Sequence, residues 1–384
     1  KVWQKDEWIG ENLLASVGKL SLHATRVDFP NNIIDINDIA LEKPSVTIYD
    51  YEGKRPPNTD TSADVTQETE PGIGELQWNT GGWHLSAKTI SLQDGIVAVE
   101  HETPSLPTPG MFDDSRIIVS SINGKLKNTR MINDTLESSI VINAKDRGGF
   151  LIKRLAADFK FTPKIMEFKH LDIITRSSHL RDYFAMHYHH FNDDMQDFID
   201  NVTLDGHFTN SEVSSEDLAY FAPETKSWNK IFSVEGTAHG KIKNLSGRKM
   251  IIKAGEDNYL DGDITLNGLP DIDNTFIDFR ARQLKTNYNE LARLIPSLKD
   301  VTTPKLSALG NINFSGSYTG YIRDFVAYGT LVTDIGLLKT DLHMKIPDKG
   351  KPEYQGNVST TNFKLGKFID NSQVNNVTFN GRID

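Results

Sequence analysis

The chain contains no cysteine among its 384 residues, and this absence removes whole classes of structure and chemistry. Disulfide frameworks, thiolate metal sites and cysteine nucleophiles are all excluded. A composition without thiols also suits an oxidising compartment, where stray cysteines are a liability. We therefore expect a fold held together by packing and hydrogen bonds alone.

Long apolar runs and basic stripes are missing as well. No stretch approaches the roughly 18 to 20 consecutive apolar residues of a membrane-spanning helix. The formal net charge is −10 and Lys and Arg form no long run, so we predict no nucleic-acid partner. The chain starts at Lys1 and stops in a strand-like pattern, VTFNGRID. We interpret it as a processed or excised segment whose membrane anchor would lie outside it.

Hydrophobic residues are scarce, at 38% of the chain, but their arrangement is regular. Soluble domains typically have about 45 to 50%. In residues 231–243, IFSVEGTAHGKIK, the side chains of Phe232, Val234, Ala238 and Ile242 share one side of a two-residue period. Polar and charged residues take the other side. This alternation predicts a strand with one apolar and one polar face, and it recurs through much of the chain.

One strand pattern is repeated within the sequence. A set of apolar residues in IDINDIALEKPSVTI returns at a constant offset in SAKTISLQDGIVAV, and weaker echoes follow in FKHLDI, ARQLKT and TNFKL. Repetition of this kind favours a stacked, quasi-one-dimensional architecture. The weaker matches have an alternative explanation, because similar short patterns recur by chance in any β protein. The matching positions are Ile36, Ile39, Leu41, Val46 and Ile48 in the first copy and Ala87, Ile90, Leu92, Val97 and Val99 in the second.

The domain organisation that we predict is one continuous segment over residues 1–384. Its sub-segments are about 1–103, 115–210 and 228–384, and the stretch at 52–73, rich in Thr, Asp, Glu and Pro, is expected to be a mobile polar loop. A three- to four-residue apolar spacing predicts an amphipathic helix over 178–202 that packs through Phe184, Phe191 and Phe198. A second, short helix is predicted over 287–296, where Pro296 ends it.

The search for chemistry gives no catalytic site. His187, His190 and Asp194 would share a face of the longer helix, but one helix offers too few metal ligands, so a solvated flank is the better interpretation. GEDNYLDGD lacks the closing Glu of a calcium loop. No nucleotide-binding or hydrolase motif is present. We predict no metal, no cofactor and no enzymatic activity.

Several long stretches closely resemble the TamB family, the translocation and assembly module subunit, in its Bacteroidota form. The order of these stretches is specific, and with the amino-terminal DFPNNIIDINDIALEKPSVTIYDYEGKRPP the resemblance covers nearly the whole chain. They are ITRSSHLRDYF, DDMQDFIDNVTLDGHFTNSEVSSEDLAYFAPE, GKIKNLSGRKM, DGDITLNGLPDIDNTFIDFRARQLKTNYNELARLIP and INFSGSYTGYIRDFVAYGTLVTDIGLLKTDLHMKIPDKGKPEYQGNVSTTNFKLGKFI.

The resemblance implies a member of the AsmA-like, repeating β-groove group. The fold would be mostly β: an elongated, taco-like, open and curled antiparallel sheet with a few interspersed α-helices. It would sit in the periplasm, anchored at the inner membrane, and meet an outer-membrane barrel of the Omp85 class. The implied role is to move phospholipid between membranes, to assist outer-membrane protein assembly, or both. The amino-terminal anchor and carboxy-terminal domain of a complete member are not in this chain.

An apolar face without a second layer would suit phospholipid acyl chains, because each buried CH₂ group gains about 0.8 kcal/mol. Two other classes stay open: a β-solenoid or sandwich adhesin that binds through its polar face, and a polysaccharide-acting enzyme with paired carboxylates. An ordinary sandwich core is the alternative for each face. The lipid-facing residues that we predict share a parity opposite to their charged neighbours; they are Phe232, Val234, Ala238, Ile242, Ile264, Leu266, Leu338, Leu342 and Met344.

Overall fold

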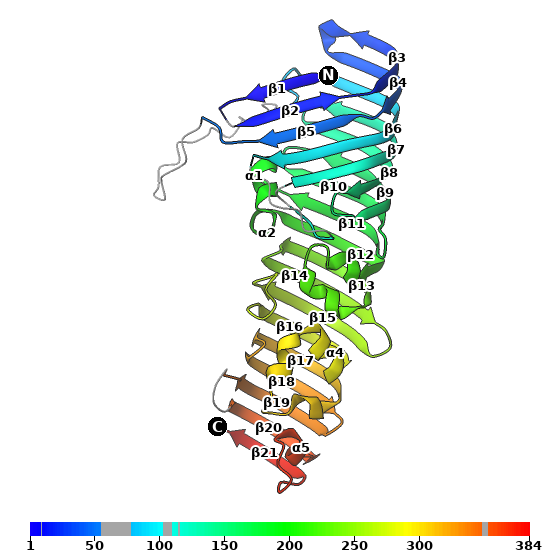
Figure 1. Cartoon of the computed structure of the whole chain (residues 1–384). Coiled ribbons are helices and arrows are strands. Elements are labelled where there is room, and N and C mark those ends of the chain that lie inside the picture. Colours follow the sequence, from blue (N-terminus) through cyan, green and yellow to red (C-terminus); the bar gives the residue numbers. More distant parts are fainter. Residues whose placement is uncertain (9, 55–77, 103–109, 114–115, 348–351) are drawn as a thin grey trace. The chain divides into compact units, whose positions relative to one another are not determined.

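The computed structural model describes residues 1–8, 10–54, 78–102, 110–113, 116–347 and 352–384. The chain divides into two compact units, unit 1 from Lys1 to Gln196 and unit 2 from Asp197 to Asp384. Strands dominate both units and the helices are short (Figure 1). The boundary falls inside the predicted sub-segment 115–210. Of the predicted polar loop at 52–73, residues 55–73 lie outside the described part of the chain.

Unit 1 is an open sheet that forks at its first strands. β6 pairs in parallel with β4 over its first half and with β5 over its second half. One branch continues from β4 to β3, and the other from β5 through β2 to β1. From β6 onward the strands run antiparallel in chain order to β11. The elements are β1 (Val2–Asp6), β2 (Glu11–Ser16), β3 (Lys19–Asp28), η1 (Phe29–Asn31), β4 (Ile33–Glu42), β5 (Ser45–Asp50), β6 (His84–His101), β7 (Arg116–Ile132), β8 (Thr135–Asp146), β9 (Leu151–Phe161), β10 (Ile165–Ile174), β11 (His179–His187) and α1 (Phe191–Gln196).

Unit 2 is an antiparallel meander in which each strand from β12 to β21 pairs with the next. Short helices connect some of the strands. The elements are α2 (Phe198–Asn201), β12 (Thr203–Ser214), α3 (Ser215–Leu218), η2 (Pro223–Trp228), β13 (Ile231–Lys241), β14 (Asn244–Ala254), β15 (Asn258–Asn267), β16 (Phe276–Asn287), α4 (Tyr288–Leu294), η3 (Pro296–Asp300), η4 (Leu306–Leu309), β17 (Asn311–Tyr321), β18 (Asp324–Thr333), β19 (Gly336–Lys345), β20 (Glu353–Phe363), α5 (Leu365–Phe368) and β21 (Val377–Ile383).

The fold class is therefore a mostly antiparallel open sheet with a few short helices, as the alternation of the sequence predicts. The curled, taco-like form that the resemblance implies is not observed, since the sheets are neither closed nor strongly curled. The strong internal repeat has a direct structural meaning. Ile39 pairs with Ile90 and Val46 with Val97, so the two copies lie side by side as parallel partners in one ladder.

The weaker repeats mark β-bulges. A bulge adds one residue to a strand, so two apolar residues on the same face are separated by three positions rather than two. In FKHLDI, Phe168 and Leu171 join one apolar cluster, and His170 between them has a φ of 50°. In ARQLKT, the register shifts between Ala281 and Leu284, which also share a cluster.

The prediction of a helix over 178–202 is wrong for the first half of that range. Residues 179–187 form strand β11, which pairs with β10, and only α1 and α2 are helical. The reason is tertiary: Phe184 pairs with Phe168, and β10 supplies the hydrogen bonds that a helix would otherwise make internally. The hairpin turn before β11 is tight, since Ser178 donates its backbone N–H to Thr175 Oγ1 at 2.8 Å.

The short helix predicted over 287–296 is confirmed as α4. Asn287 caps it, because its Oδ1 accepts the backbone N–H of Glu290 at 3.0 Å. Ser214 caps α3 in a similar way, because its hydroxyl accepts the backbone N–H of Glu216 at 3.2 Å.

Candidate functional site

The strand registers of unit 2 bring alternate residues onto one face of the sheet. Paired residues of an antiparallel ladder point to the same side, so a face can be followed from strand to strand. Val234 pairs with Ile252, Ile252 with Leu260, and Leu260 with Leu284. The row continues from Leu284 to Phe314. We call this side the apolar face; its larger side chains are Phe232, Val234, Ile252, Leu260, Ile264, Leu266, Ile277, Phe279, Leu284, Phe314, Tyr318, Phe325, Leu331, Leu338, Leu342 and Met344.

The opposite side, which we call the polar face, carries the charged neighbours. Glu235 lies between the apolar-face positions 234 and 236, and Asp341 pairs with Tyr328 and Asn357. On this face His239 binds Asp205 at 2.5 Å and His343 binds Asp324 at 2.7 Å across adjacent strands. The sheet is thus amphipathic over its width.

The centre of the apolar face is packed sideways within the sheet. Phe279, Ala281 and Phe314 are its buried members, and every hydrophobic residue packed against them also lies on β15, β16, β17 or β18. Unit 1 has a similar cluster around Ile140 and Leu171, with members on β7 to β11 only. The buried members of these clusters are covered by one another and by neighbouring side chains, and the hydrophobic residues around them stay partly exposed.

Small residues form a row between two bulky rows of this face. Gly262 pairs with Ala281, Ala281 with Gly316, Gly316 with Gly329, and Gly329 with Thr340. A Cβ atom at position 316 would lie 2.0 Å from the Tyr328 carbonyl oxygen, and the φ of 148° there also demands glycine. Leu284 and Phe314 flank this row of small residues on one side, and Phe279 and Tyr318 flank it on the other.

Short helices build a wall along one end of the strands. η2 contacts both α3 and α4, and η4 contacts both α4 and α5. Trp228 of η2 packs edge-on against Phe232 of the apolar face, with ring centroids 5.8 Å apart, and its Nε1–H donates to the Leu294 carbonyl at 3.1 Å. The wall is therefore fixed to the sheet through an aromatic contact.

An ionic network ties η2 to α4. Lys230 Nζ lies 3.0 Å from Glu290 Oε2, and Arg293 Nη1 lies 3.1 Å from Glu290 Oε1. Burial raises the pKa of the Glu290 carboxyl, but the hydrogen bonds from Lys230 and Asn258 outweigh that effect and hold the pKa below its usual value. The carboxylate therefore stays charged and keeps the wall together at neutral pH.

Residues 295–310, which we call the strap, lie across the apolar face. The strap leaves α4 at one end of β16, and the Ser297 hydroxyl donates to Asp273 in the turn at the other end, at 2.5 Å. Val301 then packs with Met344, against the row that contains Phe325. Lys305 returns to the wall, with Nζ 2.8 Å from Asp370. Figure 1 shows α4 and the segment after it over β16 to β19.

The structure places most of the predicted lipid-facing residues together. Phe232, Val234, Ala238, Ile264, Leu266, Leu338 and Leu342 lie on the apolar face and are partly exposed. Ile242 lies in the turn after β13, outside the ladder. Met344 is on the face, but it is 7% exposed and packs against Val301, so the strap covers it and it is not open to a ligand.

The three predicted packing phenylalanines have separate surroundings. Phe184 lies on β11 and joins the apolar cluster of unit 1. Phe191 begins α1 and packs edge-on against Phe161 and Tyr188, with ring centroids 5.4 and 5.3 Å away. Phe198 begins α2 in unit 2. Phe191 therefore joins a helix to the sheet of its unit in the predicted way.

Some residues of the face were missed by the sequence prediction. Leu245, Met250, Phe279 and Phe314 all lie on it. The alternation in FIDFRARQL and INFSG could have identified Phe279 and Phe314. The bulges in β14 and β16, however, change which alternate positions lie on the apolar face. Assigning residues to a face by odd or even number is therefore valid only within a stretch of strand that contains no bulge.

Within the part of the chain that the structure describes, no three His, Asp or Glu side chains converge to hold a metal ion. Asp194, from the set considered as metal ligands, is engaged elsewhere, since its Oδ2 accepts the backbone N–H groups of His189 and His190 at 2.5 and 3.2 Å. Its role is to cap the chain entering α1.

No family model, curated protein or solved structure matches the chain. Among the residues that are described, no helix is both long enough and apolar enough to cross a bilayer.

Proposed function

We propose that the chain is a cell-envelope scaffold whose apolar face conducts phospholipid acyl chains between membranes. The observation that carries the proposal is the apolar face itself: a register-linked surface over β13 to β20 whose central cluster draws every member from the sheet. In an ordinary sandwich, a second sheet would contribute members to that cluster.

The geometry suits a hydrocarbon chain. The row of small residues runs across the strands, with neighbouring positions about 4.8 Å apart, and we propose that a hydrocarbon chain lies along it. Each CH₂ group removed from water contributes about 0.8 kcal/mol. Because the sheet is not strongly curled, the groove gets its depth from the helical wall and the strap. The polar face stays in water.

The wider role follows from the resemblance of the sequence to the TamB family. We propose a periplasmic segment of a protein anchored at the inner membrane, which bridges to an outer-membrane barrel of the Omp85 class and assists protein assembly, secretion, or both. In this account the chain works without catalysis or cofactor, through an apolar path alone.

Phospholipid extracted from the purified chain tests the proposal. We expect a mass spectrum of the extract to contain phospholipid, and a Leu266→Asp variant to retain several-fold less, since a charge on the apolar face opposes entry of a hydrocarbon chain. Thr237→Asp, on the polar face of β13, is the matched control and should retain as much as the unchanged chain. Absence of phospholipid from the unchanged chain would reject the proposal.

An interaction module is the second candidate, and one observation favours it. Four large hydrophobic side chains are exposed on the polar face of β18 and β19: Val326, Tyr328, Val332 and Leu337, at 43, 63, 43 and 40%. Val332 and Leu337 pair directly. If charge substitutions here, and not on the apolar face, abolished the activity of the full-length protein, the module would be the better account.

A further inference from the structure

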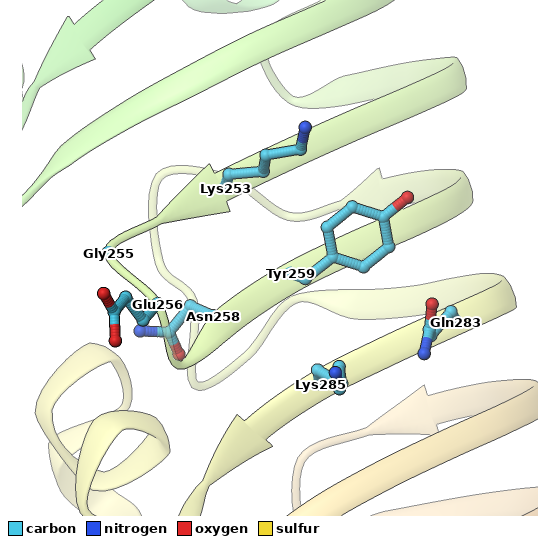
Figure 2. A pocket seen from close by; sticks show the side chains of 7 residues that line it. All are labelled: Lys253, Gly255, Glu256, Asn258, Tyr259, Gln283 and Lys285. Atoms are coloured by element: carbon cyan, nitrogen blue, oxygen red, sulfur yellow. The ribbon is translucent and has the colours of Figure 1, made fainter.

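A recess on the polar face of unit 2 presents two lysines beside a tyrosine. It lies at the β14–β15 turn and has a volume of about 320 Å³. Figure 2 shows its side chains, with Lys253 extended over the Tyr259 ring. The lining residues are Lys253, Gly255, Glu256, Asn258, Tyr259, Gln283 and Lys285.

The register explains why these side chains lie together. Tyr259 of β15 pairs with Lys253 of β14 on one side and with Lys285 of β16 on the other. Directly paired side chains are about 5 Å apart, so both lysines reach the space above the tyrosine. Their neighbours Leu260 and Leu284 belong to the apolar face. The recess and the apolar face are therefore on opposite sides of the sheet.

The two lysines flank Tyr259 on either side, without a carboxylate between them. Lys253 Nζ lies 5.9 Å from the centre of the Tyr259 ring, within the range of a cation–π interaction. In the described part of the chain, neither Lys253 nor Lys285 has an ion-pair partner. Glu256 is the one acid of the lining, and it is exposed in the turn.

Two other acids nearby, Asp261 and Glu290, are already paired with cations, and Asp257 is exposed in the turn next to Glu256. Arg282 Nη2 lies 2.5 Å from Asp261 Oδ1. Glu290, at the base of the turn, binds Lys230 and Arg293. The recess therefore presents two lysines that no described carboxylate pairs with, on a chain whose net charge is −10.

The frame of the recess is fixed before any ligand arrives. The Asn258 amide donates to the Ala254 carbonyl at 3.1 Å and to Glu290 Oε2 at 3.2 Å. Asn258 Oδ1 accepts the Thr286 hydroxyl at 2.7 Å. These bonds lock the β14–β15 turn to β16 and α4. A rigid frame lowers the ordering cost of binding.

We propose that this recess binds a phosphate group. Lys253 and Lys285 neutralise the anion from two sides, and the Tyr259 hydroxyl and the Gln283 amide, both at the same surface, donate hydrogen bonds to its oxygens. The phosphate is either free in solution or part of a lipid headgroup at a membrane surface. Because the recess is on the polar face, it acts separately from the proposed acyl path.

Phosphorus NMR of inorganic phosphate, titrated with the full chain, tests the site. We expect line broadening that reports binding, and in the double variant Lys253→Gln/Lys285→Gln an affinity weaker by about tenfold, since two exposed ion pairs are lost. The matched control is Lys127→Gln/Lys339→Gln, which removes two exposed strand lysines outside the recess. It should bind phosphate with the affinity of the unchanged chain.

Vesicles distinguish the two sources of phosphate. Phosphatidylcholine vesicles with and without phosphatidic acid are sedimented with each variant. Binding that needs both phosphatidic acid and the recess lysines supports a headgroup, whereas phosphate binding without vesicle binding supports a soluble ligand. Equal phosphate affinity in the recess variant and the control, or no binding of phosphate or vesicles by the unchanged chain, would overturn the proposal and leave the acyl path untouched.

Discussion

Phe314 and Tyr328 lie on adjacent strands and point to opposite sides of the sheet, which makes them a direct test of the two faces. Phe314 is 9% exposed within the central cluster, and Tyr328 is 63% exposed. We expect Phe314→Ala to lower the free energy of unfolding by about 3 to 5 kcal/mol through lost packing. Tyr328→Ala should change it by less than about 0.5 kcal/mol. Denaturant titration of both variants gives the comparison, and similar losses would mean that the faces are misassigned.

Asp172 gives unit 1 a pH dependence of known sign. The hydrogen bond from His179, at 2.6 Å, and the one from Arg154 lower the pKa of its carboxyl against the opposing effect of burial. The folded pKa thus lies below the unfolded value of about 3.9. Its stabilising contribution is complete above the unfolded pKa and is lost as pH falls through the folded pKa.

Replacing this carboxylate should remove part of the acid sensitivity. We expect the free energy of unfolding of Asp172→Asn to fall less between about pH 6 and about pH 3 than that of the unchanged chain. Asp257→Asn, in an exposed turn, is the control and should keep the original difference. A variant whose loss on acidification equals that of the unchanged chain would show that the contacts of Asp172 do not hold in solution.

At the scale of elements, the sequence was informative about strands and less so about what covers them. The repeated residues of the first strands proved to be direct ladder partners, because stacking identical positions places Ile39 beside Ile90. The spacing of Leu180 and Phe184 led to a wrong helix prediction, because residues four positions apart also lie on the same face of a strand such as β11. Where one sequence fits both the helical and the strand period, tertiary partners decide which structure forms, and the sequence alone does not show those partners.

The helix α1 should be anchored by one aromatic residue. Phe191 packs against Phe161 and Tyr188, so Phe191→Asp would bury a charge without a partner and lower the free energy of unfolding by a few kcal/mol. Ile199→Asp, at a position 39% exposed in α2, should have little effect. An unchanged denaturant midpoint in Phe191→Asp would mean that α1 is free of the sheet.

The strap was not foreseen from the sequence, because its contacts join residues far apart in the chain. Val301 is 6% exposed and touches Met344 and Ile346. We expect Val301→Asp to release the strap, to cost a few kcal/mol of stability and to raise the exposure of Met344 to oxidation by hydrogen peroxide. Leu337→Asp, on the polar face and 40% exposed, is the control. Unchanged protection of Met344 in Val301→Asp would contradict the covering role.

At the scale of the whole molecule, the amphipathic sheet could be predicted from the sequence. The helices and the strap that lie along and across its apolar face could not. Alternation in IFSVEGTAHGKIK identified the apolar side of β13 correctly. The wall and the strap, which lie along and across the apolar face, depend on contacts such as Trp228 to Leu294 and Ser297 to Asp273. No local pattern encodes these pairings, since each is set by the three-dimensional course of the strands.

Photo-crosslinking to phospholipid tests the central claim most directly. Crosslinkers placed at Val234, Leu266 and Leu342, one at a time, lie on the apolar face, and those at Glu235 and Asp341 lie on the polar face. After incubation of the chain with phospholipid vesicles and irradiation, we predict lipid adducts from the first three positions and none above background from the last two. Equal capture from both faces, or capture from the polar face alone, would contradict the account.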